Sequence, residues 1–201
     1  MKPIHTSPLA ILTLLASLAG CTVFPNGEPP RVMDIAVPEQ PTARTPGFGK
    51  TLQVDTPQAT EPFDSSRILT KPSPSEFQVY GGVRWRDTAP VVVREVMIAS
   101  LREEGRFNGV TNESSPTASD LTLSTDLYGF HSETFGDQPR VVITLYGQLM
   151  DNHTRETLCT GDFAITRPAS AREVDAVVDA FGRGGEQLGQ ELRAWLSSCL
   201  D

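Results

Sequence analysis

The sequence is poor in the residues and motifs that most enzymes need. Histidine and cysteine each occur only 3 times in 201 residues. There is no Gly-x-Ser-x-Gly elbow, no His-Glu-x-x-His motif, no Cys-x-x-Cys pair and no phosphate-cradling glycine loop that follows a strand. These absences argue against a hydrolase, a zinc enzyme or a nucleotide-binding enzyme. The sequence therefore predicts a protein without catalytic residues.

Positive charge is also scarce, with 17 Lys and Arg against 25 Asp and Glu, a net charge of −8. A protein that binds nucleic acid needs basic residues to neutralise phosphate groups. The acidic balance therefore predicts no nucleic-acid partner. It also disfavours adsorption of the whole protein body on an anionic membrane surface.

Long apolar runs are missing except near the start of the chain. Residues 9–19 form an apolar run of eleven residues, whereas a helix that spans a membrane needs about 20. Lys2 supplies a positive charge ahead of this run, and Ala19-Gly20 supply the small residues that a signal peptidase requires. We therefore predict that residues 1–20 are a signal peptide, cleaved between Gly20 and Cys21.

The cysteine at this place specifies the class of signal. Leu18-Ala19-Gly20-Cys21 resembles the lipobox of bacterial lipoproteins, in which the cysteine takes a diacylglycerol and its new amine is usually acylated. The resemblance implies a covalent lipid on Cys21, with acyl chains such as palmitate, and no other cofactor. An ordinary secretory signal with a chance cysteine is the alternative. Two or more acyl chains anchor a protein stably, so we expect a membrane-tethered protein.

The residue after the lipidated cysteine influences where a lipoprotein resides. In proteobacterial lipoproteins an aspartate there retains many of them at the inner membrane, and this chain has Thr22. The resemblance therefore implies the periplasmic face of the outer membrane. Export also places the remaining cysteines, Cys159 and Cys199, in an oxidising compartment, where we predict one disulfide. Two buried free thiols are the alternative.

Proline marks the region after the anchor. Residues 22–62 hold eight of the sixteen prolines, so this stretch cannot be one continuous helix or strand. We interpret residues 21–30 as a lipidated tether, of which the last nine residues reach about 30 Å when extended, and residues 31–201 as a single domain. The predicted early strands are Arg31–Val37, Thr51–Asp55 and Ser66–Lys71.

The middle of the chain predicts a strand followed by a helix. Residues 76–86 alternate in polarity and indicate one strand, with Phe77, Val79, Gly81, Val83 and Trp85 on one face. A helix is expected to begin at Asp87-Thr88, with Thr88 or Asp87 as the cap and a proline in the first turn, and to end at Gly105. Residues 107–111 are expected to form a short strand.

The second half predicts three longer strands and one long helix. The strands are residues 121–130, 141–150 and 156–165, with a hairpin turn at 151–155. Ser170-Ala171-Arg172-Glu173 fits a capping box that opens a helix with apolar residues at three- and four-residue spacing. Glycines 182, 184 and 185 in this helix either weaken it or allow close packing on the sheet. The fold class is α+β: an antiparallel-rich, mixed sheet with two main helices on one face.

The sequence gives little indication of a metal site or a ligand site. Of the two histidines in the mature chain, His131 and His153, each lies in or beside a predicted turn, so both are interpreted as surface residues and no metal site is predicted. The apolar stripes of the two helices are interpreted as core rather than as a lipid-binding groove.

The order of these elements resembles the ABC-type transport auxiliary lipoproteins that accompany MCE-type lipid transport systems. The resemblance extends over most of the mature chain and is carried by Arg67-Ile68, Tyr80, Trp85, Leu101 to Phe107, Leu121/Leu123/Leu127, Val141 to Asp151, Phe163, Ala180-Phe181 and Trp195-Leu196.

The resemblance implies a non-catalytic, outer-membrane-anchored subunit that assists the transport of phospholipids or similar apolar molecules. Its partners would be an MCE-domain protein and the ABC permease and ATPase of the same system, and several copies would form a ring. One alternative is a structural or assembly lipoprotein of the outer membrane without a transport role. Another is a lipoprotein enzyme, since envelope hydrolases also carry lipoboxes.

Overall fold

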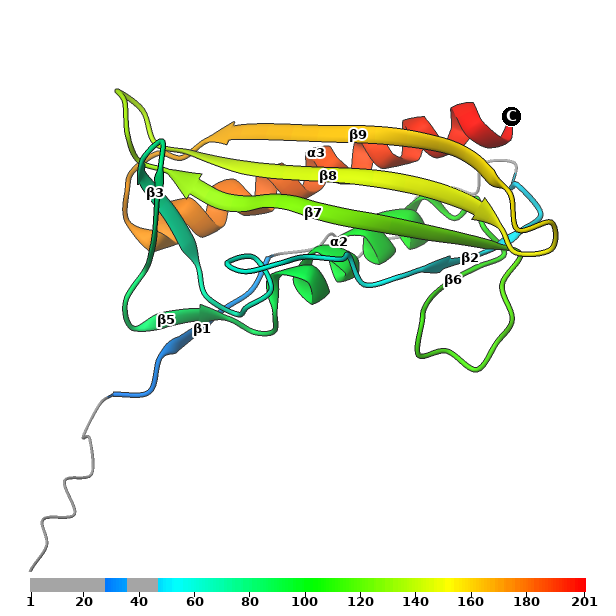
Figure 1. Cartoon of the computed structure of the whole chain (residues 1–201), viewed down its shortest axis with the longest axis horizontal. Coiled ribbons are helices and arrows are strands. Elements are labelled where there is room, and N and C mark those ends of the chain that lie inside the picture. Colours follow the sequence, from blue (N-terminus) through cyan, green and yellow to red (C-terminus); the bar gives the residue numbers. More distant parts are fainter. Residues whose placement is uncertain (1–27, 36–46) are drawn as a thin grey trace, which may run out of the picture.

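Three long antiparallel strands form the centre of the protein, which a computed structural model describes for residues 28–35 and 47–201 (Figure 1). They are β7 (Leu121–Glu133), β8 (Arg140–Asp151) and β9 (Thr157–Pro168). β8 pairs with β7 on one side and with β9 on the other. The predicted hairpin turn is present, because the carboxylate of Asp151 accepts hydrogen bonds from the backbone N–H groups of His153 and Thr154.

Shorter strands extend the sheet beyond β7. β2 (Thr51–Val54) runs parallel to the start of β7, and β3 (Leu69–Ser73) runs parallel to its end. β6 (Gly109–Asn112) pairs with β2 in parallel, and β4 (Glu76–Val79) pairs with β3 in antiparallel. β1 (Arg31–Met33) and β5 (Val83–Trp85) form a separate parallel pair. The sheet is therefore mixed, with its long strands antiparallel, as predicted.

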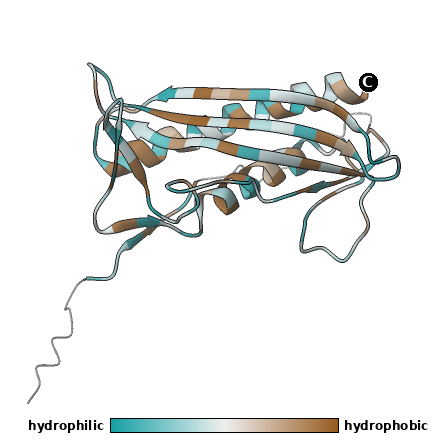
Figure 2. Cartoon of the chain, in the orientation of Figure 1, coloured by the Kyte–Doolittle hydropathy of each residue, from teal (hydrophilic) through white to brown (hydrophobic). Residues whose placement is uncertain are grey.

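Two helices cover one face of this sheet, α2 (Ala89–Glu104) and α3 (Val174–Leu200) (Figure 1). Figure 2 shows apolar and polar residues alternating along the long strands, which places one apolar row toward the helices. The largest fully buried side chains are Trp85, Phe130, Phe181, Leu52, Ile68, Met97, Leu101, Leu121, Leu123, Ile143, Leu145 and Leu149. The predicted α+β class with two helices on one face is confirmed.

The glycines of α3 allow close packing, which decides between the two interpretations of the sequence. A Cβ atom on Gly184 would lie 3.0 Å from Cδ1 of Ile143 in β8, and one on Gly185 would lie 3.1 Å from Cγ1 of Val96 in α2. Larger side chains at these positions would push α3 away from its neighbours. Gly182 is different, since a Cβ there meets nothing within 4 Å.

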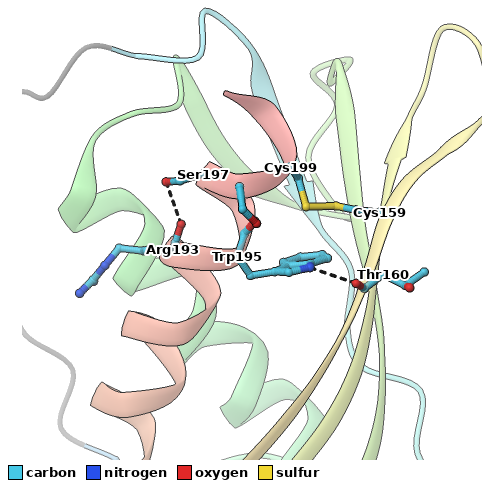
Figure 3. The surroundings of a disulfide bond; sticks show 7 residues. Cys159, Thr160, Arg193, Trp195, Ser197 and Cys199 are labelled. Carbon is cyan, nitrogen blue, oxygen red and sulfur yellow. Dashed lines mark hydrogen bonds between the residues drawn. A yellow bond between two sulfur atoms is a disulfide. The ribbon is translucent and has the colours of Figure 1, made fainter.

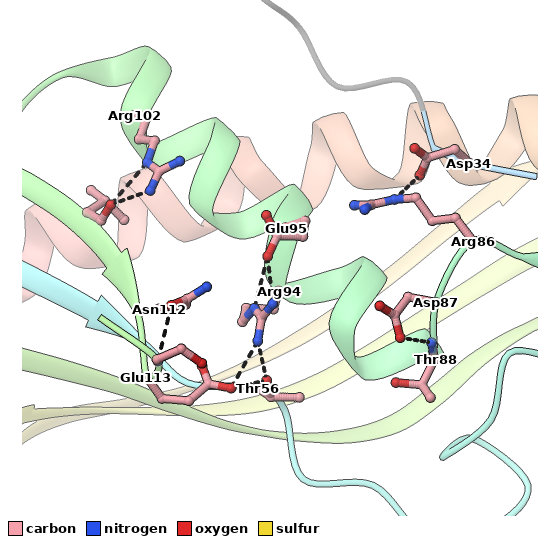
Figure 4. Close-up of polar contacts among 12 residues, drawn as sticks. Asp34, Thr56, Arg86, Asp87, Thr88, Arg94, Glu95, Arg102, Asn112 and Glu113 are labelled. Carbon is pink, nitrogen blue, oxygen red and sulfur yellow. Dashed lines mark hydrogen bonds and ion pairs between the residues drawn. The ribbon is translucent and has the colours of Figure 1, made fainter. Parts of the chain in front are cut away.

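Two arginine side chains of α2 bind β6 and the segment that follows it (Figure 4). Arg94 pairs with Glu95 in its own helix and, at 2.9 Å, with Glu113 in the segment after β6. Arg102 donates two hydrogen bonds to the carbonyl oxygen of Val110 in β6, at 3.0 and 2.7 Å. These contacts hold the strand that follows the helix against the helix itself.

The predicted ends of α2 are partly right. Gly105 adopts the left-handed conformation with φ 69°, and its N–H group bonds to the carbonyl of Leu101, as expected of a C-terminal glycine cap. Thr88 is the N-cap residue, but its side chain makes no cap hydrogen bond. The expected side-chain cap is therefore wrong, and the proline in the first turn, which lacks an N–H group, leaves one donor fewer to satisfy.

The single strand predicted for residues 76–86 is wrong, because the chain turns in its middle. β4 ends at Val79 and β5 begins at Val83, with Gly82 between them at φ 70°. Trp85 is fully buried, whereas Phe77 is 39% and Val79 50% exposed. The period-two pattern therefore runs through two short strands in different sheets, and only the second reaches the core.

Other predicted boundaries also need correction. The capping box at residues 170–173 is wrong, since α3 begins at Val174 and its N-cap residue, Glu173, makes no side-chain cap bond. β3 and β6 begin three and two residues later than predicted, at Leu69 and Gly109. β1 ends at Met33, and the last two residues of that predicted strand lie outside the described residues.

Candidate interaction surfaces

The residues predicted to carry the anchor lie outside the described part of the chain. Gly20, Cys21 and Thr22 precede Glu28, the first described residue, so cleavage, lipidation and sorting stay predictions. β1 begins three residues after Glu28, at one end of the elongated molecule, where β3 and β5 also lie (Figure 1). The chain therefore enters the domain at this end, which we call the anchor end.

Cys159 and Cys199 are joined as a disulfide that connects β9 to the last turn of α3 (Figure 3). The sulfur atoms are 1.98 Å apart and the Cα atoms 6.1 Å apart. Next to them, Nε1 of Trp195 donates a hydrogen bond to the carbonyl oxygen of Thr160, and the indole packs edge-on against Phe163. The end of α3 is thus attached to the sheet by both a covalent and a polar contact.

His131 is buried, which corrects the interpretation of this residue as a surface histidine. It lies within β7 and is 7% exposed, because β7 continues to Glu133 rather than ending near Phe130. Its ring lies 5.9 Å from the ring of Phe63 and 5.3 Å from that of Phe77, centroid to centroid. Nδ1 has no hydrogen-bond partner among the described residues. His153 lies in an exposed turn, as expected.

Burial lowers the pKa of His131, because the charged imidazolium loses contact with water. The carboxylate of Glu133, 3.8 Å from Nε2, opposes this shift, and the ammonium of Lys71 adds to it. The ring is therefore an uncharged member of an aromatic cluster at neutral pH.

The polar cavity at the hairpin turn is built from side chains that hold loops together. It has a volume of about 470 Å³ and is lined by Lys50, Ser119, Asp120, Asp151, Asn152, His153 and Thr154. Asp120 accepts hydrogen bonds from the N–H and hydroxyl groups of Thr51, which lower the pKa of its carboxyl. Within residues 28–35 and 47–201, no three His, Cys, Asp or Glu residues are grouped to hold a metal ion.

The exposed apolar side chains form two sets. Val32, Phe77 and Val79 lie on the strands of the anchor end, and Tyr128 and Leu158 lie on the long strands. Tyr128 is 62% exposed, on the sheet face opposite the helices, which we call the open face. Sequence reasoning did not separate these sets, because the period-two pattern does not reveal which strands lie at a sheet edge.

The two other tyrosines of the chain are less available for contact with a partner. Tyr80 bonds through its hydroxyl to Ser132 and to the carbonyl of Arg172, and it packs against the core. Tyr146 is half-buried on β8. Tyr128 is therefore the tyrosine that a partner could reach directly.

Residues 33–193 match the family model of the ABC-type transport auxiliary lipoprotein component. The chain belongs to this family. The resemblance described above is thus confirmed at the level of an ABC-type transport auxiliary lipoprotein. No curated protein matches the chain.

Solved structures share the fold. The protein XCC0632 from Xanthomonas campestris is 26% identical, with a TM-score of 0.75 over 84% of this chain and 95% of that one. An uncharacterized protein is 16% identical, with a TM-score of 0.66 over 84% and 99%. A PelC dodecamer from Paraburkholderia phytofirmans is 15% identical over 73% and 89%, and its TM-score of 0.41 is too low to support an argument about assembly.

Membership of a lipoprotein family indicates association with a membrane. In the part of the chain that the structure describes, neither helix is long and apolar enough to cross a bilayer.

Proposed function

We propose that this protein is a non-catalytic, outer-membrane-anchored subunit of an ABC transporter that works with an MCE-domain protein to move phospholipids or similar apolar molecules between membranes. The family match over residues 33–193 is the observation that carries the proposal. ATP hydrolysis would belong to the ATPase subunit. The acyl chains on Cys21 would hold the protein, and Thr22 favours the outer membrane over the inner one.

A short tether gives such a subunit its physical advantage. The nine residues between Cys21 and Arg31 reach about 30 Å at most, so the domain is confined to a thin layer at the membrane. Confinement raises its effective concentration for any partner that arrives at that surface. Several copies around one axis would multiply the contacts with an MCE-domain partner.

The open face of the sheet offers a contact for this partner. Tyr128 projects from β7 on this face, and exposed tyrosines are enriched among the residues that carry binding energy at interfaces. The opposite face of the sheet is occupied by the two helices and the core. We therefore place the MCE-domain protein against Tyr128 and the neighbouring side chains of β8.

In-cell crosslinking tests this docking. A photoreactive residue replaces Tyr128, and a matched control replaces Glu186, which is exposed on α3, one of the helices that cover the other face of the sheet. We expect adducts with an MCE subunit from position 128 and none from position 186. Adducts from position 128 to porin-assembly or peptidoglycan-binding proteins alone would support the alternative, a structural lipoprotein without a transport role.

A further inference from the structure

The anchor end of the domain carries apolar side chains that the fold leaves exposed. Val32 is 54%, Val79 50% and Phe77 39% exposed. They lie on strands at the same end of the fold, because the chain passes from β4 through one turn into β5, and β5 pairs with β1. The N–H group of Arg31 bonds to the carbonyl of Gly82 in that turn, which joins the two strand pairs. We call Val32, Phe77 and Val79 the tip.

Each end of the tip has a basic neighbour. The ammonium of Lys71 lies 5.1 Å from the centre of the Phe77 ring. Val32 pairs in register with Arg84 on β5, and both point away from the core because their neighbours Met33 and Trp85 pack into it. One guanidinium nitrogen of Arg84 donates to the carbonyl oxygens of Trp85 and Arg86, which leaves its other donors for a phosphate.

The acidic residue of β4 faces the other way. Glu76 and Gln78 alternate with Phe77 and Val79 along the strand, and they bond to one another at 2.7 Å. Beside Val32, Arg31 pairs with Asp175, and Arg86 pairs with Asp34. Lys71 and Arg84 therefore supply the positive charge of the tip, although the chain as a whole is acidic.

This combination fits the boundary of a lipid bilayer. Apolar side chains enter the region where headgroups meet acyl chains, while the stems of Lys and Arg lie along apolar surface and their charges reach the phosphates. The tip also lies at the end of the domain that is nearest to the anchor in the chain. Six residues lie between Cys21 and Glu28, a reach of about 25 Å at most, so the membrane that holds the acyl chains is the nearest apolar surface.

We propose that the tip docks on the bilayer that holds the anchor, through Val32, Phe77 and Val79 with Lys71 and Arg84 at the phosphates. The proposal rests on the lipid anchor at Cys21 that the proposed function includes. Docking would stand the long strands away from the membrane, because β7, β8 and β9 extend from the anchor end to the far end of the molecule (Figure 1). The far turns would then point away from the membrane, and the open face would look sideways, along the membrane plane.

The test uses the mature chain, residues 21–201, coupled through the thiol of Cys21 to a maleimide lipid in vesicles of phosphatidylethanolamine and phosphatidylglycerol. Hydrogen exchange is compared between the vesicle-bound and the free protein. Amides of residues 31–34 and 76–83 are expected to exchange roughly threefold more slowly on vesicles, and those around Tyr128 and Leu158 to remain unchanged.

Three pairs of substitutions separate docking from a general effect of the surface. Val32→Ser with Val79→Ser should abolish the slowing at the tip. Tyr128→Ser with Leu158→Ser removes two other exposed apolar side chains and should leave the slowing intact. Lys71→Glu with Arg84→Glu should weaken it.

Equal exchange at the tip on vesicles and in solution would overturn the proposal. In the free protein, exchange at the tip could instead become slower as the protein concentration rises. That result would assign the surface to a second copy of the chain, and it would also overturn the proposal. Because the lipid is attached chemically, neither result depends on lipidation in the cell or on an MCE partner, so failure of the proposed function would be seen separately, in the crosslinking experiment.

Discussion

The indole Nε1 of Trp195 lies 3.1 Å from the carbonyl oxygen of Thr160, and the same indole covers the next residue of β9 so closely that a Cβ on Gly161 would lie 2.8 Å from Nε1. The position of the Trp195 indole near the end of α3 thus requires that residue 161 of β9 has no side chain. This relationship explains why a glycine occurs within a long strand, where it is otherwise unfavourable.

Truncating Trp195 should therefore destabilise the fold in two steps. Trp195→Phe keeps an aromatic ring but loses the hydrogen bond to Thr160, at a cost of about 1 kcal/mol. Trp195→Ala also removes the packing on Phe163, and the cost should rise to about 2 kcal/mol because the side chain is only partly buried. Urea unfolding measures both. Tyr128→Phe, at an exposed tyrosine, should stay within about 0.5 kcal/mol of the parent protein.

The Cys159–Cys199 disulfide should be present in protein purified from the periplasm. It closes a loop with a sequence separation of 40 residues, and in the chain-entropy model a loop of this length contributes roughly 3 to 4 kcal/mol. Replacing both cysteines by serine should lower the free energy of unfolding by about this amount. Alkylation of the native protein under non-reducing conditions checks the bond itself, and two labelled thiols besides any at Cys21 would contradict it.

The stability of the protein should fall as the pH drops below about 6.5, because of His131. Burial holds the pKa of His131 below its ordinary value of 6.5, so the unfolded chain takes up a proton before the folded protein does. The free energy of unfolding retains the full contribution of the uncharged ring above pH 6.5, and it decreases as the pH falls toward the lower pKa of the folded state. Glu133 moderates the loss, whereas Lys71 adds to it.

Two histidine variants isolate this effect. His131→Phe retains a ring against Phe63 and Phe77 but cannot be protonated, so its free energy of unfolding should vary less between about pH 7 and pH 5 than that of the parent. His153→Gln, in the exposed turn, should retain the parent's pH dependence. Urea unfolding across this range measures both, and an unchanged slope in His131→Phe would assign the dependence to other groups.

The long elements were predictable because their patterns are long. Val141, Ile143 and Leu145 repeat over enough residues to specify both the strand and its buried face, and the apolar series of α3 specifies a helix. Short patterns did not predict the structure correctly. Phe77 and Trp85 share a period-two pattern, but Gly82 lets the chain turn between them, so one remains exposed and the other is buried.

The candidate surfaces were less predictable than the fold. Whether Tyr80 or Tyr128 is free depends on contacts with Ser132 and Arg172 that lie 52 and 92 residues from Tyr80. The position of the tip depends in the same way on the pairing of β1 with β5, which are distant in the sequence. Local patterns contain no information about such pairings, whereas a lipobox can be predicted at residues 18–21 because a peptidase recognises a contiguous segment.

Changing Thr22 to aspartate should redirect the lipoprotein. In proteobacterial lipoproteins aspartate after the lipidated cysteine favours retention at the inner membrane, so Thr22→Asp should move the protein from outer-membrane to inner-membrane fractions. Cys21→Ala should abolish the mature lipidated form altogether. Membrane fractionation with marker proteins checks both, and recovery of the parent protein solely with inner-membrane markers would overturn the outer-membrane assignment.

Two glycines of α3 should respond to the same substitution with opposite signs. At Gly189 a Cβ would overlap the side chain of Ser100 in α2, with the two Cβ atoms 2.7 Å apart. Gly189→Ala therefore forces the helices apart and should cost about 1 to 3 kcal/mol.

At Gly182 a Cβ meets nothing within 4 Å. Gly182→Ala should therefore stabilise the protein by about 0.5 to 1 kcal/mol, because alanine is the better helix former. Urea unfolding of the two variants beside the parent gives the comparison, and each serves as the control for the other. If both alanines stabilised the protein equally, the contact between α2 and α3 would have to be looser than the positions of Gly189 and Ser100 imply.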